Sequence, residues 1–518
     1  MAWLDIGESL RVNAAKFPDK MALKDERRSV TFDELNRRVN RLANALLGLG
    51  LKKEDKLGVV SYNCIEFMEI YLAAAKSGVI VVPLNWRQTS KAFKYILENS
   101  DASAVIVHSE FVDTVNEIRD ELSIPPERFI SLNDEPIENY RDFGELLNSG
   151  SEDEPDVEIR NEDTWVILYT SGTTGVPKGV VRSHASYISF FLINEVEFSF
   201  KPDDYGLIVM PLYHVNSTFY SFVFTYIGAS VYVQKEKRFN PSEVLDIIDR
   251  EKITFTSLIP THYNLILSLP EGEKAKYDVS SMRSILCSSA PVWKKTKLEI
   301  MEFFKGAKLF EAYGSTEAGL VTLLRPEDQM RKLGSIGREC VGTDVIKLLD
   351  DEGNDVPIGE VGELYSRGPM MFDHYYKQPE KTKKSFRGDY FSAGDMARKD
   401  EDGYYTLIDR KDNMIITGGE HVFPSEVEGM IGEHDAVRAV AIIGEPHVKW
   451  GEAVTAVVVL KDGKECTEEE IIEFCRGRMA AFKKPKKVRF ITEEEMPRTP
   501  TGKILHRILR ERFCEATE

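Results

Sequence analysis

Residues 165–179 read WVILYTSGTTGVPKG, an apolar run followed by glycines, hydroxyl side chains and Lys178. The apolar run predicts a buried strand. Glycines let a backbone approach phosphate oxygens, while hydroxyls and a lysine supply donors and charge. The loop therefore predicts a phosphate-binding site, with a surface turn as the plain alternative. A Walker A loop is disfavoured because Pro177 stands where its second glycine would be, and no serine or threonine follows Lys178.

The chain before this loop alternates between helix and strand patterns. Thr31 and Glu34 have the spacing of a capping box ahead of a helix with apolar residues on one face. Short apolar runs that predict buried strands lie at residues 57–61, 79–85 and 104–108. This rhythm is typical of a doubly wound α/β sheet with parallel strands.

The chain after the loop falls into three further parts. The runs LIVMP, SVYVQ and TFTSLIP alternate with helical patterns and predict a second doubly wound α/β subdomain. From about 334 to 410, short strand patterns separated by DEGN and EDG turns predict a small β-barrel-like subdomain. The remaining C-terminal residues mix helical and alternating patterns, which indicates an α+β domain.

Composition narrows the class of protein. A chain of 518 residues can form more than one core, and about 150 residues per domain suggests about three structural units. The net charge of −18 is the opposite of the basic surface expected of a nucleic-acid-binding protein. Any site for a polyanion such as ATP must therefore be built from local cations and backbone N–H groups. The six scattered cysteines predict neither structural zinc nor a disulfide framework. Without a leader pattern or an apolar run of about 18 residues, we expect no transmembrane segment and a cytoplasmic protein.

Five more motifs follow the loop along the chain. They are EAYGSTE at 311–317, FSAGD at 391–395, DRKD at 409–412, TGGE at 417–420 and PRTPTGK at 497–503. With the glycine-rich loop, this set resembles the adenylate-forming superfamily over nearly the whole chain. That superfamily includes acyl- and aryl-CoA synthetases, carrier-loading adenylation domains and luciferases. The layout is similar to the crotonobetaine/carnitine–CoA ligases and the medium-chain fatty acyl-CoA ligases.

The resemblance implies a site for ATP and AMP. Tyr313 would lie against adenine, Thr316 would contact the α-phosphate, and Glu317 would hold Mg²⁺, for which a hard carboxylate is suitable. Asp395 would accept hydrogen bonds from the ribose hydroxyls, with Arg410 assisting. The expected ATP- and AMP-binding residues are Thr170, Ser171, Gly172, Thr173, Thr174, Lys178, Ser289, Ala290, Pro291, Glu311, Ala312, Tyr313, Asp395 and Arg410.

Two stretches depart from the family pattern. Ser288 and Ser289 stand where relatives usually carry the glycines of a Gly-Gly-Ala-Pro turn, and Ala393 replaces a threonine two residues before Asp395. The serines either make the pocket more polar or narrower, or are tolerated in a turn. Ala393 removes one hydroxyl beside the expected ribose site.

The last motif contributes Lys503, which would stabilise the negative charge that develops as the carboxylate attacks the α-phosphate. The expected catalytic residues are Lys503, Thr316, Glu317 and His214. Asp412 falls at the hinge about which the family's small domain rotates between its two half-reactions. The resemblance thus implies an N-terminal domain over 1–410, a hinge at 411–412 and a mobile α+β lid domain over 413–518.

The resemblance also implies a CoA site in the lid domain. The glycine loop at 417–420 would line the pantetheine tunnel, and aromatic and basic side chains would hold the nucleotide. The expected CoA-binding residues are Gly418, Gly419, Glu420, Trp450, Phe482, Lys484 and Lys486. A run of lysines on an acidic protein suits a phosphate-rich ligand, although a solvated basic face is the plain alternative.

The acyl pocket would be bordered by His214, Ser288 and Gly314. His214 orients the thiol, gates the tunnel or is simply packed. Acetate-specific relatives carry a tryptophan at the position of Gly314. Glycine leaves room, so we expect a medium-chain, branched, cyclic or aryl acid.

These features together predict an ATP-dependent acyl-CoA synthetase. Its partners would be a small carboxylic acid, ATP and CoA, with Mg²⁺ as cofactor, no nucleic acid, and a homodimer compatible with the sequence. One alternative is a stand-alone adenylation enzyme that loads a carrier protein. Another is a non-catalytic nucleotide-binding protein of the same fold, against which the intact Lys503, Glu317 and Asp395 argue.

Overall fold

The computed structural model describes residues 4–132, 136–171, 176–235, 237–289, 292, 294–498 and 504–514. Internal contacts divide the chain into two compact units. The first unit is Met1–Val345 with Ser366–Phe391, and the second is Ile346–Tyr365 with Ser392–Glu518. The contacts therefore group part of the predicted β-barrel-like subdomain with the C-terminal residues. The boundary at 410 and the hinge at Asp412 stay predictions.

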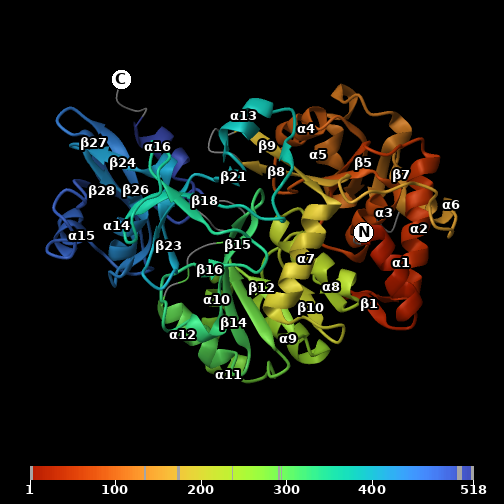
Figure 1. Ribbon diagram of the computed structural model, residues 1–518, viewed down its shortest axis with the longest axis horizontal. Helices are drawn as coiled ribbons and strands as arrows, with labels where there is room; N and C mark the ends of the chain where they lie inside the picture. Colours follow the sequence, from red (N-terminus) through yellow and green to blue (C-terminus); the bar gives the residue numbers. More distant parts are fainter. Residues whose placement is uncertain are drawn as a thin grey trace. The chain divides into compact units, whose positions relative to one another are not determined.

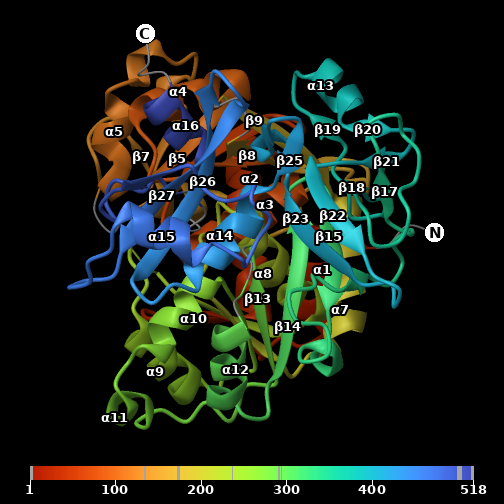
Figure 2. The same cartoon turned by 90° about the vertical axis from the view of Figure 1, so that its left-hand side faces the viewer.

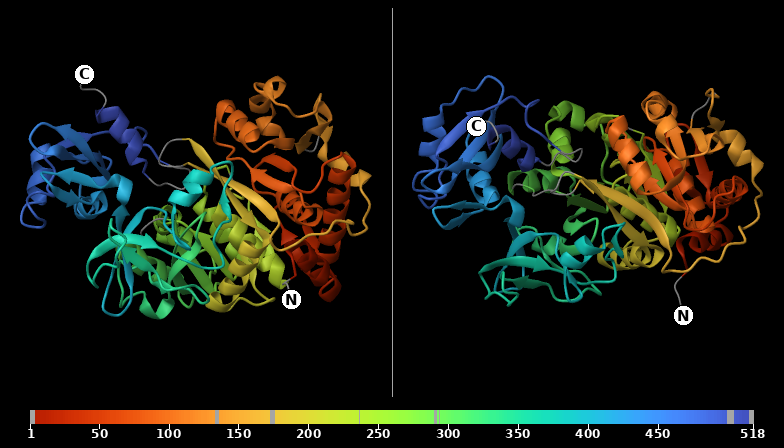
Figure 3. Two further views of the ribbon diagram at one scale, coloured as in Figure 1. Left: turned by 45° about the horizontal axis from the view of Figure 1, so that its top comes forward. Right: turned by 90° about the horizontal axis from the view of Figure 1, so that it is seen from above.

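The first sheet of the first unit has eight strands, and its middle is parallel. Each central strand is buried on both faces, which is why it reads as an apolar run. In spatial order the strands are β19 (His374–Tyr375), β9 (Pro177–Ser183), β8 (Thr164–Ser171), β4 (Ile80–Pro83), β3 (Lys56–Val60), β5 (Ala102–His108), β6 (Phe129–Leu132) and β7 (Arg141–Asp142). The β8–β9 pair is an antiparallel hairpin, seen as the long yellow ribbons of Figure 3.

The second sheet has nine strands and recruits the N-terminal β1–β2 hairpin. In spatial order they are β16 (Arg338–Glu339), β15 (Gly319–Leu324), β14 (Lys308–Ser315), β13 (Ser284–Ser288), β12 (Phe255–Leu258), β10 (Tyr205–Ile208), β11 (Ser230–Val233), β1 (Met21–Lys24) and β2 (Ser29–Thr31). Strands β14, β15 and β16 are antiparallel neighbours, so the EAYGSTE motif ends the parallel part of the sheet.

Six of the described helices share one apolar core with inward-facing residues of both sheets. They are α1 (Ile6–Lys16), α2 (Phe32–Gly48), α3 (Ile65–Ser77), α6 (Phe143–Ser149), α7 (His184–Phe198) and α8 (Val215–Ile227), and Figure 1 shows α1, α2 and α3 beside one another. As predicted, α2 begins after Thr31, whose hydroxyl accepts from the Glu34 N–H at 3.2 Å.

Other helices cover the outer faces of the two sheets, over separate apolar clusters. On the first sheet they are α4 (Ser90–Asn99) and α5 (Val112–Asn116). On the second they are α9 (Pro241–Glu251), α10 (Pro260–Leu267) and α12 (Lys294–Phe303), while α11 (Glu271–Lys274) contacts α9. The remaining elements are α13 (Pro379–Lys384) and the hairpin of β20 (Phe386–Arg387) and β21 (Tyr390–Phe391). The mixed α/β class predicted for this part is confirmed.

The second unit combines a four-stranded sheet with an α+β body. The four strands are β17 (Lys347–Leu349), β18 (Val361–Tyr365), β22 (Asp395–Lys399) and β23 (Tyr405–Arg410). The body has β24 (Ile415–Thr417), β25 (Glu420–Val422), β26 (Val437–His447), β27 (Gly451–Leu460) and β28 (Lys487–Phe490). Helices α14 (Pro424–Gly432) and α15 (Glu468–Phe474) share one apolar cluster with this sheet, and α16 (His506–Cys514) shares another; Figure 2 shows α14 and α15 beside β26.

Candidate active site

The predicted phosphate loop lies at the tip of the β8–β9 hairpin. Thr170, the penultimate residue of β8, has a buried hydroxyl that finds no hydrogen-bond partner among the described residues. The backbone of Ser171 pairs with Pro177, whereas Gly172, Thr173 and Thr174 lie outside the described residues. A buried donor without a partner at a loop of this type is suited to a ligand oxygen.

Lys178 joins this hairpin to the EAYGSTE motif. Its ammonium lies 2.7 Å from Glu317 Oε1 and donates to the Tyr375 hydroxyl at 2.7 Å. The Tyr375 hydroxyl in turn donates to Glu317 Oε1 at 2.9 Å. The structure thus brings together two predicted site residues and adds Tyr375, which no motif indicated because it lies 197 residues from Lys178. We call Lys178, Glu317 and Tyr375 the charge cluster.

Glu311, at the start of the same motif, pairs with a lysine that sequence reasoning missed. Lys297 on α12 is buried and forms an ion pair with Glu311 Oε1. Burial raises the pKa of Glu311, and the ammonium of Lys297 opposes that rise. Ala312 and Tyr313 follow on β14, opposite Leu323 and Thr322 of β15.

Gly314 has a steric requirement of its own. A β-carbon there would lie 2.1 Å from Gly319 O and 3.2 Å from Leu320 Cα, because the β14–β15 ladder shifts register between Tyr313 and Gly314. A larger residue therefore needs the backbone of β15 to move. The glycine does not by itself report the size of the acyl group, which stays a prediction.

We expect Gly314→Ala to lower the free energy of unfolding by about 1–3 kcal/mol, because the new methyl group overlaps backbone rather than a flexible side chain. Urea unfolding followed by tryptophan fluorescence measures this change. Gly272→Ala is the matched control, since a β-carbon at Gly272 meets nothing within 4 Å. Equal midpoints for the two variants would contradict the steric reading.

The predicted acyl-pocket residues His214 and Ser288 are linked through Asn216. The Asn216 amide donates to the hydroxyls of Ser288 and Ser257, each at 3.0 Å. His214 precedes α8, and its Nδ1 accepts from the Asn216 N–H at 3.4 Å. Burial lowers the pKa of His214 to about 4, so the ring is neutral at pH 7 with its proton on Nε2.

The turn after β13 is strained at one serine. Ser289 has φ of +70°, in the left-handed region that favours glycine. This departure from the family's glycine pair therefore places a β-carbon where the backbone conformation disfavours one. Ala290 and Pro291 lie outside the described residues.

In the second unit, the two predicted ribose residues lie together. Asp395 begins β22, Arg410 ends β23, and Arg410 Nε donates to Asp395 Oδ1 at 3.1 Å. Asp412 follows in a short helical turn, and its carbonyl accepts from Arg510 on α16 at 2.8 Å. The predicted hinge residue thus contacts α16.

Two of the predicted CoA residues, Gly418 and Lys486, lie beside a third, Trp450. Trp450 stacks on His447 with ring centroids 4.3 Å apart, and Lys486 Nζ lies 5.4 Å from the Trp450 centroid. The Gly418 N–H donates to the Trp450 carbonyl, and Gly418 and Gly419 both adopt positive φ. Phe482 packs partly buried against the apolar cluster beneath α14 and α15. Glu420 begins β25 and is exposed.

Neighbouring lysines of this run differ in their partners. Lys483 pairs with Glu426 at 2.7 Å, and Lys487 pairs with Glu445 at 3.3 Å. Lys484 and Lys486 form no ion pair with any described residue. The two lysines predicted to bind CoA are therefore the ones whose charge is not already matched by a carboxylate.

Lys503 lies outside the described residues, but both ends of its segment are anchored. Arg498 and Ile504 form an antiparallel bridge, and the Leu505 N–H donates to the Pro497 carbonyl at 2.9 Å. Helix α16 then begins at His506, whose Nε2 lies 2.5 Å from Glu428 Oε1 of α14. This pair holds the start of α16 against α14.

We expect the His506–Glu428 contact to weaken as pH rises. Burial and the nearby charge of Arg510 disfavour the imidazolium form of His506. The hydrogen bond and charge of Glu428, together with the charge of Asp409, favour it more strongly, so the pKa of His506 is raised above 6.5. A raised pKa means stabilisation that is complete below about pH 6.5 and lost as pH rises through the folded-state value.

The matched variant is His506→Arg, which keeps its charge at every pH used. Thermal unfolding of the two proteins should agree near about pH 6 and differ by a few degrees, on the order of the shift expected for about 1 kcal/mol, near about pH 9. If the melting temperatures of the two proteins differ by the same amount at every pH in this range, the protonation of His506 does not contribute to stability.

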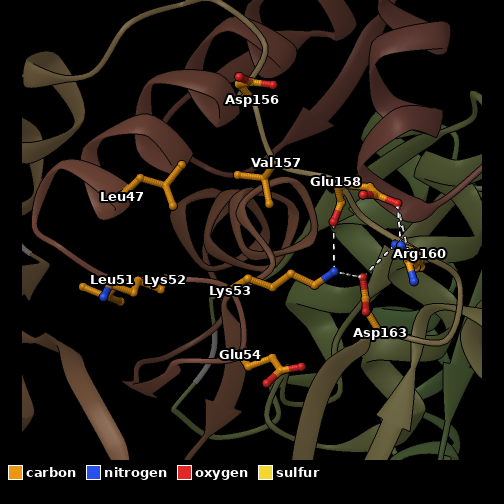
Figure 4. A pocket seen from close by; sticks show the side chains of 10 residues that line it. All are labelled: Leu47, Leu51, Lys52, Lys53, Glu54, Asp156, Val157, Glu158, Arg160 and Asp163. Carbon is orange, nitrogen blue, oxygen red and sulfur yellow. Dashed lines mark hydrogen bonds and ion pairs between the residues drawn. The ribbon is translucent and has the colours of Figure 1, made fainter.

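A surface hollow of about 690 Å³ lies apart from the charge cluster, between the end of α2 and residues 156–163 (Figure 4). Lys53 crosses it, donating to the Glu158 carbonyl at 2.9 Å and pairing with Asp163 at 2.5 Å. Arg160 pairs with Glu158 at 2.9 Å. Lys53 and Arg160 are thus already paired with carboxylates, which makes them less suited to bind phosphate.

Two absences concern the described residues only. No helix among them is both long and apolar enough to cross a membrane. They contain no group of three or more His, Cys, Asp or Glu side chains able to hold a metal ion by themselves.

Comparisons with known proteins agree with this layout. The AMP-binding enzyme model matches residues 10–376, and the AMP-binding enzyme C-terminal domain model matches residues 426–503. A feruloyl-CoA synthase of Amycolatopsis sp is 33% identical over 502 residues, covering 96% of each chain. The long-chain-fatty-acid–CoA ligase FadD13 of Mycobacterium tuberculosis is 33% identical over 512 residues, covering 98% of each.

Among solved structures, ATP-bound MatB from Rhodopseudomonas palustris is similar with a TM-score of 0.88 and 28% identity, over 99% of this chain and 100% of that one. The first family model alone spans more than half of this chain, and the relatives span nearly all of it. The chain therefore belongs to the AMP-binding, adenylate-forming enzyme family.

Proposed function

We propose that the protein is an AMP-forming acyl-CoA synthetase, which adenylates a carboxylic acid with ATP and transfers the acyl group to CoA. The charge cluster is the observation that carries the proposal. It places the ammonium of Lys178, on the strand that follows the glycine-rich loop, within 2.9 Å of the Glu317 carboxylate and the Tyr375 phenol. Reactions at phosphate depend mainly on positioning and charge neutralisation, for which this set is suited.

In the first half-reaction, the β8–β9 loop and Lys178 hold the phosphates while Thr316 contacts the α-phosphate. Tyr313 packs against adenine, and Asp395 and Arg410 bind the ribose. Lys503 stabilises the charge that develops at the α-phosphate as the acid attacks and pyrophosphate leaves.

Glu317 and its surroundings fit Mg²⁺. Mg²⁺ in phosphate-transferring sites usually takes one or two carboxylates together with substrate phosphates, rather than a cage of protein ligands. Glu317 supplies one such carboxylate, oriented by the Tyr375 hydroxyl and Lys178. The ion would supply charge neutralisation for the phosphates.

In the second half-reaction, the thiol of CoA attacks the acyl-adenylate and AMP leaves. Trp450 offers an aromatic face for the nucleotide, and Lys484 and Lys486 offer unmatched charge for its phosphates. The loop carrying Gly418, Gly419 and Glu420 passes beside Trp450 and would line the pantetheine path.

The proposal extends to the substrate class and to the setting of the enzyme. A medium-chain, branched, cyclic or aryl acid remains the expected substrate, bordered by His214, Ser288 and Gly314. A cytoplasmic location and a homodimer belong to the same proposal. Cell fractionation and light scattering test the last two.

Pyrophosphate release by purified protein is the deciding experiment. The assay contains ATP, Mg²⁺ and a panel of acids from acetate to decanoate with benzoate and crotonobetaine, each with and without CoA. Acid-dependent release together with a CoA thioester supports the proposal and names the substrate class.

Two outcomes favour the alternatives. Acid-dependent release without a CoA thioester indicates an adenylation enzyme whose acceptor is a carrier protein, which a thioester assay with a phosphopantetheinylated carrier then tests. ATP binding without release for any acid indicates a nucleotide-binding protein that has lost catalysis.

A further inference from the structure

Arg182 is a fully buried arginine next to the charge cluster. It lies on β9, and its two terminal nitrogens donate to backbone carbonyls, Nη1 to Thr316 O at 2.6 Å and Nη2 to Met370 O at 2.5 Å. The guanidinium carbon lies 5.2 Å from the ring centroid of Tyr187 and 4.9 Å from that of Phe219. Its Nε finds no acceptor among the described residues.

Stability alone does not account for this side chain. Burying a cation carries a large desolvation cost, and well-packed apolar residues in place of buried ions are often neutral or stabilising. Burial accordingly lowers the pKa of Arg182, and the nearby charges of Asp373 and Glu317 only partly oppose this. What arginine adds over an apolar residue is two donors in a rigid, planar arrangement.

Those donors lie where three segments meet. Side chains alternate along a strand, so Lys178 and Arg182 project from the same face of β9. Lys178 contacts the Glu317 carboxylate and Tyr375, and Arg182 contacts the carbonyls of Thr316 and Met370. The two cations therefore tie Thr316–Glu317 and residues 370–375 to the strand that carries the phosphate loop.

The backbone of this junction has little freedom elsewhere. The Phe372 N–H donates to the Glu317 carbonyl at 2.7 Å, and the Ala318 N–H donates to the Ser315 hydroxyl at 3.0 Å. Gly319 has φ of +73°, and a β-carbon there would lie 2.7 Å from Met370 Cβ. The Thr316 carbonyl depends on Arg182 for the hydrogen bond that completes this arrangement.

We propose that Arg182 is a positioning residue for adenylation, which holds the Thr316–Glu317 peptide at a set position beside strand β9. It acts through the backbone and touches no substrate atom. This inference rests on the proposed function, because Thr316 and Glu317 matter only if the protein adenylates an acid. A displacement of about 1 Å at such a site costs roughly 100-fold in rate.

Arg182→Met and Arg182→Lys test the inference, in the full-length protein and with the best acid from the panel. We expect Arg182→Met to lower kcat for pyrophosphate release roughly 100-fold, with the KM for ATP changed by less than about threefold. Arg182→Lys keeps the charge but loses the planar pair of donors, so its kcat should lie between those of Arg182→Met and wild type. All assays are run well below the melting temperature of each variant.

Arg325→Met is the matched control, because Arg325 is a partly buried arginine of the same unit that pairs with Glu197 at 2.6 Å. A purely structural role for Arg182 predicts a lower melting temperature with kcat within about twofold of wild type, as for the control, and that result would overturn the inference. Wild-type protein that releases no pyrophosphate with any acid would refute the proposed function instead.

Discussion

Replacing Glu317 by glutamine should lower the rate of acid-dependent pyrophosphate release by roughly 100-fold or more, with little change in melting temperature. Glutamine keeps the shape and one acceptor oxygen for the Tyr375 hydroxyl, which now donates to Glu317 Oε1 at 2.9 Å. It removes the negative charge that matches Lys178 and that would help to hold Mg²⁺. The loss is therefore one of charge rather than of packing.

Two further variants separate the parts of the cluster. Tyr375→Phe removes one hydrogen bond to Glu317 and keeps both charges, so we expect a loss of about tenfold. Glu299→Gln changes an exposed glutamate of the same unit and should leave the rate unchanged. Equal rates for wild type and Glu317→Gln would show that Glu317 has no part in the proposed mechanism. The charge cluster would then have only a structural role.

Lys503→Ala should separate the two half-reactions. We expect pyrophosphate release to fall by roughly 100-fold or more, because a cation at the developing charge is lost. Thioester formation from supplied acyl-adenylate and CoA should stay within about threefold of wild type, since that step makes no use of the lysine. Stopped assays of pyrophosphate release and of thioester measure the two steps independently.

A complementary variant should show the reverse pattern. Lys484→Ala with Lys486→Ala removes the two lysines of this run that form no ion pair with a described carboxylate, so we expect the KM for CoA to rise about tenfold or more while adenylation persists. Lys464→Ala, an exposed lysine elsewhere in the second unit, is the control. Loss of both half-reactions in Lys503→Ala would contradict the proposal that Lys503 acts only in adenylation.

Much of the fold follows from local sequence. The apolar runs at 57–61 and 104–108 are the strands Lys56–Val60 and Ala102–His108, and the Thr31 cap starts the helix Phe32–Gly48. These elements can be predicted from the sequence because a strand buried on both faces requires a continuous run of apolar residues. A helix cap likewise involves only residues of the first helical turn. The order of motifs along the chain likewise indicated the family before any contact was known.

Pairings between distant segments were not readable in this way. Nothing local shows that Met21–Lys24 joins the second sheet beside Ser230–Val233, or that His374–Tyr375 joins the first beside Pro177–Ser183. A strand of two to four residues is too short for its residue pattern to predict which strand it pairs with. Packing of the whole unit selects the partner.

The sequence by itself determined the residue types of the site: a glycine-rich loop, Lys178, Glu317, Asp395 and a C-terminal lysine. Only the tertiary structure decided that Tyr375 bridges Lys178 and Glu317, that Arg182 holds the Thr316 carbonyl from 134 residues away, and that Gly319 requires a glycine at position 314. The physical reason is the range of the interactions. Periodicity, capping and turn chemistry act between neighbours in the chain, whereas hydrogen bonds, ion pairs and steric exclusion act between atoms that folding brings together.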